Sequence, residues 1–154
     1  ADLMRKGING NEIIDKTYYE KTYIQNQILG RALLESMLIM DKKCIVSVIR
    51  QKSMEFFQAK PSDLEGIVSQ LRLTKGVEVA IFLHELSPQK FKVSLRSKGK
   101  VDVSEIAKFY GGGGHVRAAG VTMEGSSHDV INNITARIAL QLKHEHEEEQ
   151  VGEQ

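Results

Sequence analysis

The sequence predicts an α/β protein, with α+β as the alternative: a mixed β-sheet flanked by helices, in which a glycine-rich loop leads into a short helix. Two observations predict this class. Apolar residues recur at a helical period near both ends of the chain, and short apolar or alternating runs typical of strands lie between them. The chain has 154 residues, 41% of them hydrophobic, which is enough for one domain with its own core.

The first part of the chain predicts a helix followed by a strand. Residues 11–37 are expected to form one long helix, and residues 41–43 a polar turn. The run CIVSVI, residues 44–49, is apolar and β-branched and predicts a buried strand. Residues 51–59 fit no element clearly, although their apolar residues are expected to cover the core. The residues behind these two predictions are Ile14, Tyr18, Ile24, Ile28, Leu29, Ala32 and Leu33 for the helix, and Met54, Phe56 and Phe57 for the core.

The middle of the chain predicts a helix and a hairpin. A helix is expected to begin in PSDLEG, where Ser62 stands three residues before Glu65 at the spacing of a capping box, with an inner face of Ile67, Val68 and Leu71. Residues 77–83 and 90–96 are expected to pair through a turn in SPQK. In the second strand Phe91, Val93 and Leu95 alternate with Lys90, Lys92, Ser94 and Arg96, so one face of the sheet should be wet.

The last part predicts helix, strand and helix. Asp102 or Ser104 can cap a short helix that carries Ile106, Ala107 and Phe109. A strand is expected at residues 121–123, and a helix capped by Ser126 at residues 126–143. The final residues, HEHEEEQVGEQ, are expected to be a frayed helix and tail. The expected organisation is residues 1–60 as a helical connection and first strand, 61–143 as the core domain and 144–154 as an acidic tail.

Composition excludes several classes of protein. The single cysteine, Cys44, excludes an internal disulfide and a thiolate zinc site, and its apolar neighbours predict a buried thiol. No apolar run approaches the length of a membrane span, and the N-terminus has no apolar signal region, so we expect a soluble protein of the reducing cytoplasm. The chain starts with Ala1 rather than methionine, which suggests a piece of a longer protein.

The charge is unevenly distributed along the chain. The net charge is +1, but residues 145–154 hold five Glu and no Lys or Arg. Without them 21 basic residues face 15 acidic ones, a balance of +6. A basic body suits an anionic ligand, although a solvated basic face is equally common.

The stretch FYGGGGHVRAAG, residues 109–120, is the strongest candidate for a site. A flexible linker is one interpretation of Gly111, Gly112, Gly113 and Gly114, but a predicted helix and a predicted strand flank them closely. The other interpretation is an anion cradle, in which backbone amides turn to one side and a short helix starts near His115. Small Ala118, Ala119 and Gly120 would let that turn approach the sheet.

Other side chains could complete such a site. His115 could donate to a phosphate, and Arg96, with Ser94 beside it in SLRS, could form a forked contact. Lys98, Lys100 and Arg117 could add positive field. Among the remaining histidines, His144 and His146 could chelate metal only adventitiously. The sequence has no metal-ligand spacing, nucleophile elbow or Walker lysine, so it offers binding residues without catalytic ones.

These motifs resemble a known family. GGGGHVRAAG (residues 111–120), preceded by KVSLRS (92–97), resembles the C-terminal DHH-associated domain of DHH phosphoesterases, most closely the oligoribonuclease and 3′-phosphoadenosine-5′-phosphate phosphatase type. DLEGIVSQLRLTKGVEVAIFLHE (63–85) is similar to the segment before that group's hairpin. The resemblance covers residues 62–142, with looser agreement before them. Tyr110 departs from the pattern, since phenylalanine is expected there.

The resemblance implies a two-lobed enzyme that hydrolyses very short RNA or nucleoside bisphosphates. An N-terminal lobe with an Asp-His-His motif would hold two manganese ions, and this chain contains no such triplet, so the lobe and its metals lie outside it. In this chain Gly111–Gly114 and His115 would hold substrate phosphate, and Arg96 would contact phosphate or base. The implied partners are short oligoribonucleotides or nucleoside phosphates, the DHH lobe and a second copy of the chain. Binding to a membrane is not expected.

Three alternatives stay open. The chain could be the same domain of a cyclic dinucleotide phosphodiesterase, such as one acting on c-di-AMP, or of a single-strand exonuclease, although Gly120 fits the oligoribonuclease type better. It could be a stand-alone regulatory module that binds nucleotides. It could also be a dimerisation domain that uses the long first helix.

Overall fold

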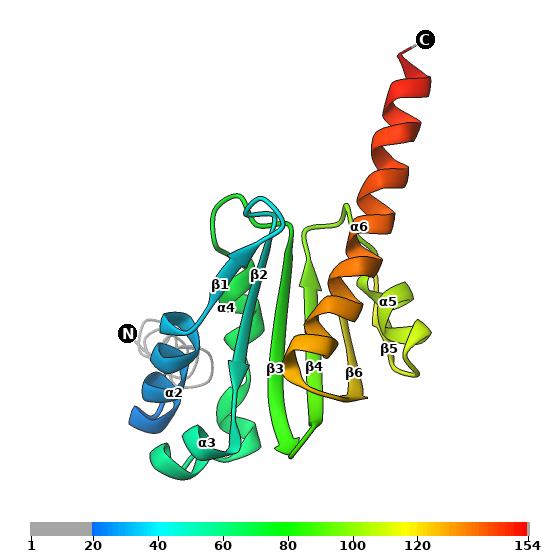
Figure 1. Ribbon diagram of the computed structural model, residues 1–154. Coiled ribbons are helices and arrows are strands. Elements are labelled where there is room, and N and C mark those ends of the chain that lie inside the picture. The colour runs from blue at the N-terminus through cyan, green and yellow to red at the C-terminus, as the bar shows by residue number, and fades with distance from the viewer. Residues whose placement is uncertain (1–19, 154) are drawn as a thin grey trace, which may run out of the picture.

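The computed structural model describes residues 20–153, which form one six-stranded sheet with helices on both faces (Figure 1). The strand order is β1-β2-β3-β4-β6-β5. Only the β2–β3 pair is parallel among the described strands, so the sheet is mixed and the predicted α/β class is confirmed. The helices are α2 Tyr23–Leu34, α3 Gln51–Phe57, the 3-10 turn η2 Pro61–Leu64, α4 Ile67–Arg72, α5 Val103–Phe109 and α6 Ser127–Gly152; the strands are β1 Met37–Ile39, β2 Cys44–Ile49, β3 Val79–Ser87, β4 Lys90–Ser97, β5 Gly113–His115 and β6 Ala118–Glu124.

Two hydrophobic cores lie on opposite faces of the sheet. The larger is closed by α5 and α6, which bury residues such as Ile106 and Ile134 against Val93 of β4 and its neighbours. The smaller is closed by α2 and α4, which bury residues such as Ile28 and Leu71 against β2 and β3. The two faces of the sheet are therefore covered unequally, because α2 and α4 lie over only one half of the sheet.

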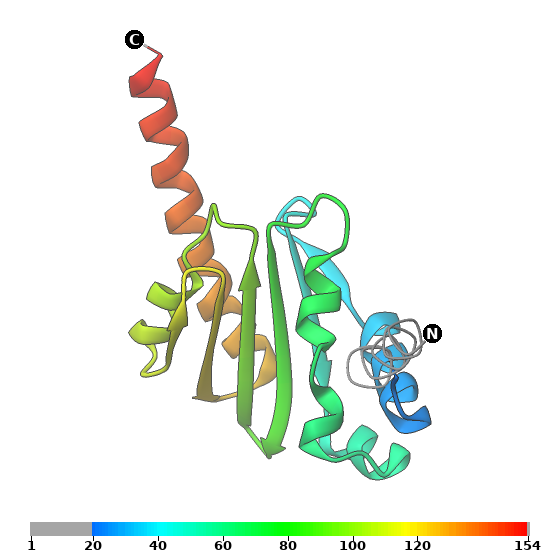
Figure 2. The same cartoon turned by 180° about the vertical axis from the view of Figure 1, so that it is seen from behind.

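The uncovered half of the sheet belongs to β4, β6 and β5. Side chains alternate along a strand, so Phe91, Val93 and Leu95 of β4 enter the larger core, while the residues between them face the other side. On that side none of the described helices covers β6 or β5, and α4 reaches only the near side of β4 (Figure 2). The wet face predicted from the alternation in residues 90–96 is thus present.

Several predicted elements match the structure closely. The strand at residues 44–49 has the predicted bounds, and the hairpin forms from β3 and β4. Asp102 caps α5 by accepting from the Ser104 amide, and Ser126 caps α6 by accepting from the Asp129 amide. Cys44 is completely buried, and burial, followed by the nearby Glu78 carboxylate, raises the pKa of its thiol to about 11.

The helical predictions for the first part of the chain were partly wrong. Residues 11–19 lie outside the described residues, and α2 begins only after Thr22, which forms a reciprocal capping box with Gln25. The chain turns after α2 so that Met37 begins β1, a strand the sequence did not predict. Ser62 and Glu65 form no cap; instead the Lys60 amide donates to the Asp63 carboxylate at 2.7 Å. Phe56, expected to cover the core, is 75% exposed.

Two predictions near the C-terminus also need correction. No short helix follows the glycines: residues 113–115 form β5, residues 116–117 a turn, and Ala118 begins β6. The acidic end continues α6 as a regular helix to Gly152, and this part of α6 projects beyond the sheet (Figure 1). None of the helices in residues 20–153 combines the length and apolar character needed to cross a membrane.

Candidate functional site

Four of the predicted site residues, Ser94, Arg96, Gly113 and His115, gather on the uncovered half of the sheet. In the strand register Ser94 lies opposite Gly120 and Gly120 opposite Gly113, while Arg96 lies opposite Ala118 and Ala118 opposite His115. Residues opposite each other in antiparallel strands project from the same face. We call this surface the open face; it comprises Lys92, Ser94, Arg96, Ala118, Gly120, Thr122, Gly113 and His115.

The open face has a floor of small residues between two basic side chains. Arg96 and His115 stand on strands separated only by β6, which places their backbones about 10 Å apart. Between them lie Ala118 and, in the next row, Gly120 and Gly113, which project little or nothing. A ligand of phosphate size can therefore reach the main chain of β6 and β5 while both basic side chains bracket it.

Arg96 carries a positive charge that no carboxylate balances. Its guanidinium donates to the Leu95 carbonyl at 3.0 Å, and it forms no ion pair within residues 20–153. Partial burial, followed by the positive charge of Arg72 at the end of α4, lowers the pKa of Arg96 below its usual value. Two guanidinium groups are thus held near each other without a counterion, an arrangement that favours binding of an anion.

The first two glycines of the run end α5. The Gly111 amide donates to the Lys108 carbonyl at 3.0 Å, and the Gly112 amide donates to the Ala107 carbonyl at 2.7 Å. With Gly111 at a φ of +90°, this is a Schellman helix end. Because both amides are already bonded to helix carbonyls, they are not free for an anion, and the expected convergence of all four glycine amides was wrong.

The remaining glycines have different surroundings. A Cβ on Gly112 would overlap the Gly120 carbonyl oxygen, and one on Gly114 would overlap the backbone of Ala118 and Ala119. A Cβ on Gly113 would meet no atom within 4 Å, because this residue shares the open face with His115. The run is therefore mostly a requirement of folding, and only Gly113 presents bare main chain on the open face.

The structure separates Arg117 from the other candidates. Arg117 is exposed in the turn between β5 and β6, and its guanidinium lies against Gly99 in the loop after β4. Lys98 and Lys100 belong to this same loop, and Lys100 lines a different pocket. These three cations raise the positive electrostatic potential at one end of the sheet, but they do not lie in the row of Arg96 and His115.

Sequence reasoning missed a cavity beside the open face. It has a volume of about 360 Å³ and lies between the start of α4 and strands β3 and β4. Arg72 was also missed, since only the fold brings the end of α4 near Arg96. The alternation in β4 did point to Lys92 as a residue of the wet face. The cavity is lined by Pro61, Leu64, Glu65, Gly66, Val68, Phe82, His84, Leu86, Lys92, Ser94 and Arg96.

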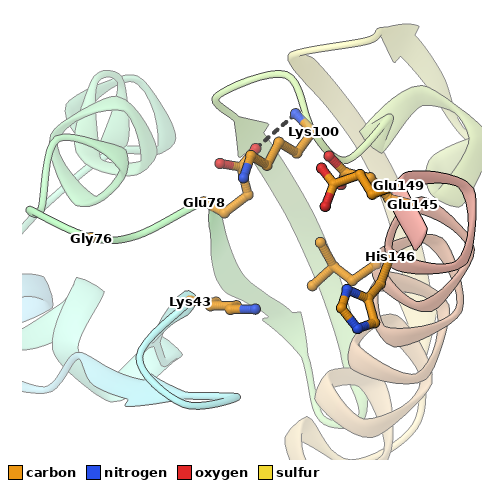
Figure 3. Close-up of a pocket in the computed structure, with 8 residues that line it drawn as sticks. Lys43, Gly76, Glu78, Lys100, Glu145, His146 and Glu149 are labelled. Carbon is orange, nitrogen blue, oxygen red and sulfur yellow. Dashed lines mark hydrogen bonds between the residues drawn. The ribbon is translucent and has the colours of Figure 1, made fainter. Parts of the chain in front are cut away.

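A second pocket, at the projecting part of α6, has mixed charge. Lys43 and Lys100 lie across it from Glu145 and Glu149, with Glu78 on the same side as the two lysines (Figure 3). The Lys100 backbone amide donates to Glu78 at 2.8 Å. Three carboxylates outnumber two ammonium groups here, so the pocket is a weaker anion site than the open face. Within residues 20–153 no three His, Cys, Asp or Glu side chains form a group that could hold a metal ion.

Comparison with known proteins supports the resemblance seen in the motifs. The "bifunctional oligoribonuclease and PAP phosphatase NrnA" of Thermus thermophilus is 43% identical over 63 residues, which cover 41% of this chain and 19% of that protein. A "membrane protein-large ribosomal subunit bL9 fusion protein" of Onion yellows phytoplasma is 23% identical over 142 residues, or 92% of this chain and 16% of that protein. The chain thus spans less than a fifth of these curated relatives.

A solved structure extends the likeness to the fold. The crystal structure of an exopolyphosphatase-related protein from Bacteroides fragilis superimposes with a TM-score of 0.75 at 25% identity, covering 89% of this chain and 40% of that one. A family model described as the DHHA1 domain matches residues 41–144, which include β2 to β6 and most of α6. On this match, the chain belongs to the DHHA1 domain family.

Proposed function

We propose that this chain is the substrate-binding domain of a DHH-type phosphoesterase and that it holds the phosphates of very short RNA or nucleoside bisphosphates on the open face. The observation that carries the proposal is Arg96, a guanidinium without a carboxylate partner in residues 20–153, aligned with His115 across a floor of small residues. Phosphate oxygens accept forked hydrogen bonds from arginine, so Arg96 is the principal anchor.

The other residues of the open face have complementary roles in this proposal. His115 donates to a second phosphate oxygen from the edge strand, and the Ser94 hydroxyl bonds to phosphate or sugar. Gly113 lets the ligand approach the backbone, since no side chain stands above it. Arg72 and Lys92 raise the positive potential that draws the ligand in.

Hydrolysis itself is assigned to another part of the enzyme. The resemblance implies two manganese ions, which would activate water for attack on the phosphorus atom. Residues 20–153 offer no group of ligands that fits such ions, so no catalytic step is assigned to this chain. Its contribution is to bind and orient the phosphate. A location in the cytoplasm is part of the same proposal, in line with the single free cysteine.

An NMR titration of the chain with the 5′-phosphorylated diadenylate pApA tests this proposal. We expect the largest shifts at Arg96, Gly113 and His115. Arg96→Ala should weaken binding about tenfold or more, because a charged hydrogen bond contributes on the order of 1.5–3 kcal/mol. Arg117→Ala is the matched control, since it removes the same charge from outside the row, and should change affinity less than threefold.

Two results would contradict the proposal. One is a set of shifts confined to the pocket of Lys43, Lys100 and Glu145. The other is equal loss of affinity in the Arg96→Ala and Arg117→Ala variants, which would indicate general charge attraction rather than a site. Inorganic tripolyphosphate in parallel separates a site for any polyphosphate from one that requires a nucleotide, an alternative raised by the relative from Bacteroides fragilis.

A further inference from the structure

The cavity beside the open face is continuous with the proposed phosphate site. Ser94 and Arg96 belong to both, since they project from β4 into the open face and also line the cavity. From Arg96 the cavity runs along β4 to Lys92, which lies four residues earlier on the same strand. Four residues of a strand span about 13 Å. A ligand anchored at Arg96 can therefore extend into it.

The lining of the cavity is apolar on one side and polar on the other. Phe82 and Val68 are 4% and 7% exposed and, with Leu64, provide apolar walls. His84, Lys92 and Ser94 provide polar groups along the strand side. Its volume of about 360 Å³ falls in the range of sites that hold small ligands. A flat aromatic ring with a polar edge suits such a lining.

His84 is the group that most directly indicates a ligand. It is only 9% exposed and has no hydrogen-bond partner within residues 20–153. No fully buried side-chain nitrogen in residues 20–153 lacks a partner, so the His84 ring nitrogens are accessible from outside the core. His84 lines both this cavity and a shallower neighbouring pocket beside Gln51 and Met54. Burial and the neighbouring Lys92 charge lower the pKa of His84, which leaves a neutral imidazole with one donor and one acceptor.

We propose that this cavity binds the nucleobase of the ligand whose phosphate lies on the open face, with His84 at the polar edge of the base and Phe82 and Val68 against its apolar surface. This inference rests on the proposed function and adds to it: the site selects nucleotides over other phosphate esters. A second phosphate is a poor occupant, because its charge would lose hydration against Phe82 and Val68.

Matched ligands test the inference on the full chain. Adenosine 5′-monophosphate and ribose 5-phosphate carry the same phosphate and sugar, and only the first has a base. We expect the nucleotide to bind at least tenfold more tightly in an NMR titration, the scale of base contacts elsewhere. The imidazole nitrogen signals of His84 should shift with the nucleotide and not with the sugar phosphate.

A pair of tryptophan variants identifies the cavity. Leu86→Trp fills it from a rim position that is 39% exposed, so the fold should tolerate the change. It should weaken binding of the nucleotide about tenfold, to the level of ribose 5-phosphate, and leave ribose 5-phosphate unchanged. Leu34→Trp, at an 87% exposed position on α2, is the control and should alter neither affinity.

The outcomes distinguish this inference from the function on which it rests. Equal affinities of the wild-type chain for both ligands, or an equal loss of both in Leu86→Trp, would overturn the base-binding cavity. If Arg96→Ala leaves the affinity for ribose 5-phosphate unchanged, the phosphate site fails instead. Adenosine without phosphate then still tests the cavity: a His84 shift abolished by Leu86→Trp supports it, and the absence of any shift overturns it.

Discussion

The four consecutive glycines differ residue by residue in what they do. Gly111 ends α5 with a positive φ, and Gly112 and Gly114 lie against the backbone of β6. Gly111 and Gly113 both have free space where a Cβ would stand, but Gly111 has a positive φ, and only Gly113 of the four combines that space with a place on the open face. The composition of the run predicted a special site, but it could not distinguish these roles, because each depends on where β6 lies relative to the end of α5.

This difference predicts that substitution of Gly112 lowers stability, whereas substitution of Gly113 lowers affinity for the ligand. Gly112→Ala should lower the free energy of unfolding by about 1–3 kcal/mol, because its methyl group overlaps the Gly120 carbonyl oxygen and β6 must shift. Gly113→Ala should change stability by less than about 0.5 kcal/mol and weaken binding of pApA. Urea unfolding and NMR titration measure the two effects. Equal destabilisation by both substitutions would refute the distinction between these glycines.

A second residue-scale prediction concerns pH. The pKa of His84 is lowered in the fold, mainly by burial, so the native state binds a proton less readily than the unfolded chain does. The stability that this neutral side chain supports is present above about pH 6.5 and is lost as pH falls through the lowered native pKa. The free energy of unfolding should therefore decrease from pH 7.5 to 5.

His84→Gln should remove part of that decrease, and urea unfolding at several pH values measures it. His128→Gln is the control, because His128 is exposed on α6 and both variants keep the same number of histidines. A pH dependence that is the same in wild type and His84→Gln would show that other groups cause it.

At the scale of elements, α6 holds the helix that leads into the glycine run. The Gln141 side chain accepts from the Asp102 amide at 2.7 Å and donates to the Asp102 carbonyl at 3.0 Å, at the start of α5. At the other end the Tyr110 hydroxyl donates to the Asn133 carbonyl at 3.1 Å. This bond gives the hydroxyl of Tyr110, found where phenylalanine was expected, a structural role.

Gln141→Ala should therefore lower the free energy of unfolding by about 1–3 kcal/mol, because it leaves two backbone groups of Asp102 without partners. Thermal unfolding measures this change. Gln150→Ala, near the exposed end of α6, should have almost no effect. A weak effect of Gln141→Ala, similar to that of Gln150→Ala, would mean that water replaces the Gln141 side chain as the hydrogen-bond partner of Asp102.

Elements with a strong local pattern were predictable, and those set by tertiary contacts were not. Alternation in residues 90–96 predicted both β4 and its wet face, and Asp102 and Ser126 marked true helix starts. β1 was missed because its three residues are defined by pairing with β2 rather than by their own pattern. β5 was missed because its glycines predicted a loop, with a short helix from His115, and only pairing with β6 makes residues 113–115 a strand.

At the scale of the whole molecule, the acidic end of α6 opposes the charge of the rest of the chain. Residues 145–154 hold five Glu, and without them the net charge would be +6 instead of +1. Removing residues 144–154 takes away helix that lies beyond Leu142, the last α6 residue packed against the larger core. The sheet and the open face should therefore be unaffected.

The shortened chain should bind pApA more tightly at low salt, by about two- to fivefold, because the long-range attraction is greater. The difference should vanish near 0.5 M salt, where screening is nearly complete beyond a few ångströms. Titrations at several salt concentrations, with circular dichroism to confirm the fold, measure this effect. An increase that persists at high salt would indicate that the acidic end covers the site directly.

The position of β5 at the margin of the sheet has a consequence for chain length. On one side α4 bounds the ligand, whereas beyond His115 the described sheet has no further strand and hence no barrier. A longer polynucleotide anchored at Arg96 would meet no further strand of the described sheet at this margin. We therefore expect this domain to hold one end of a ligand without limiting the length of the rest.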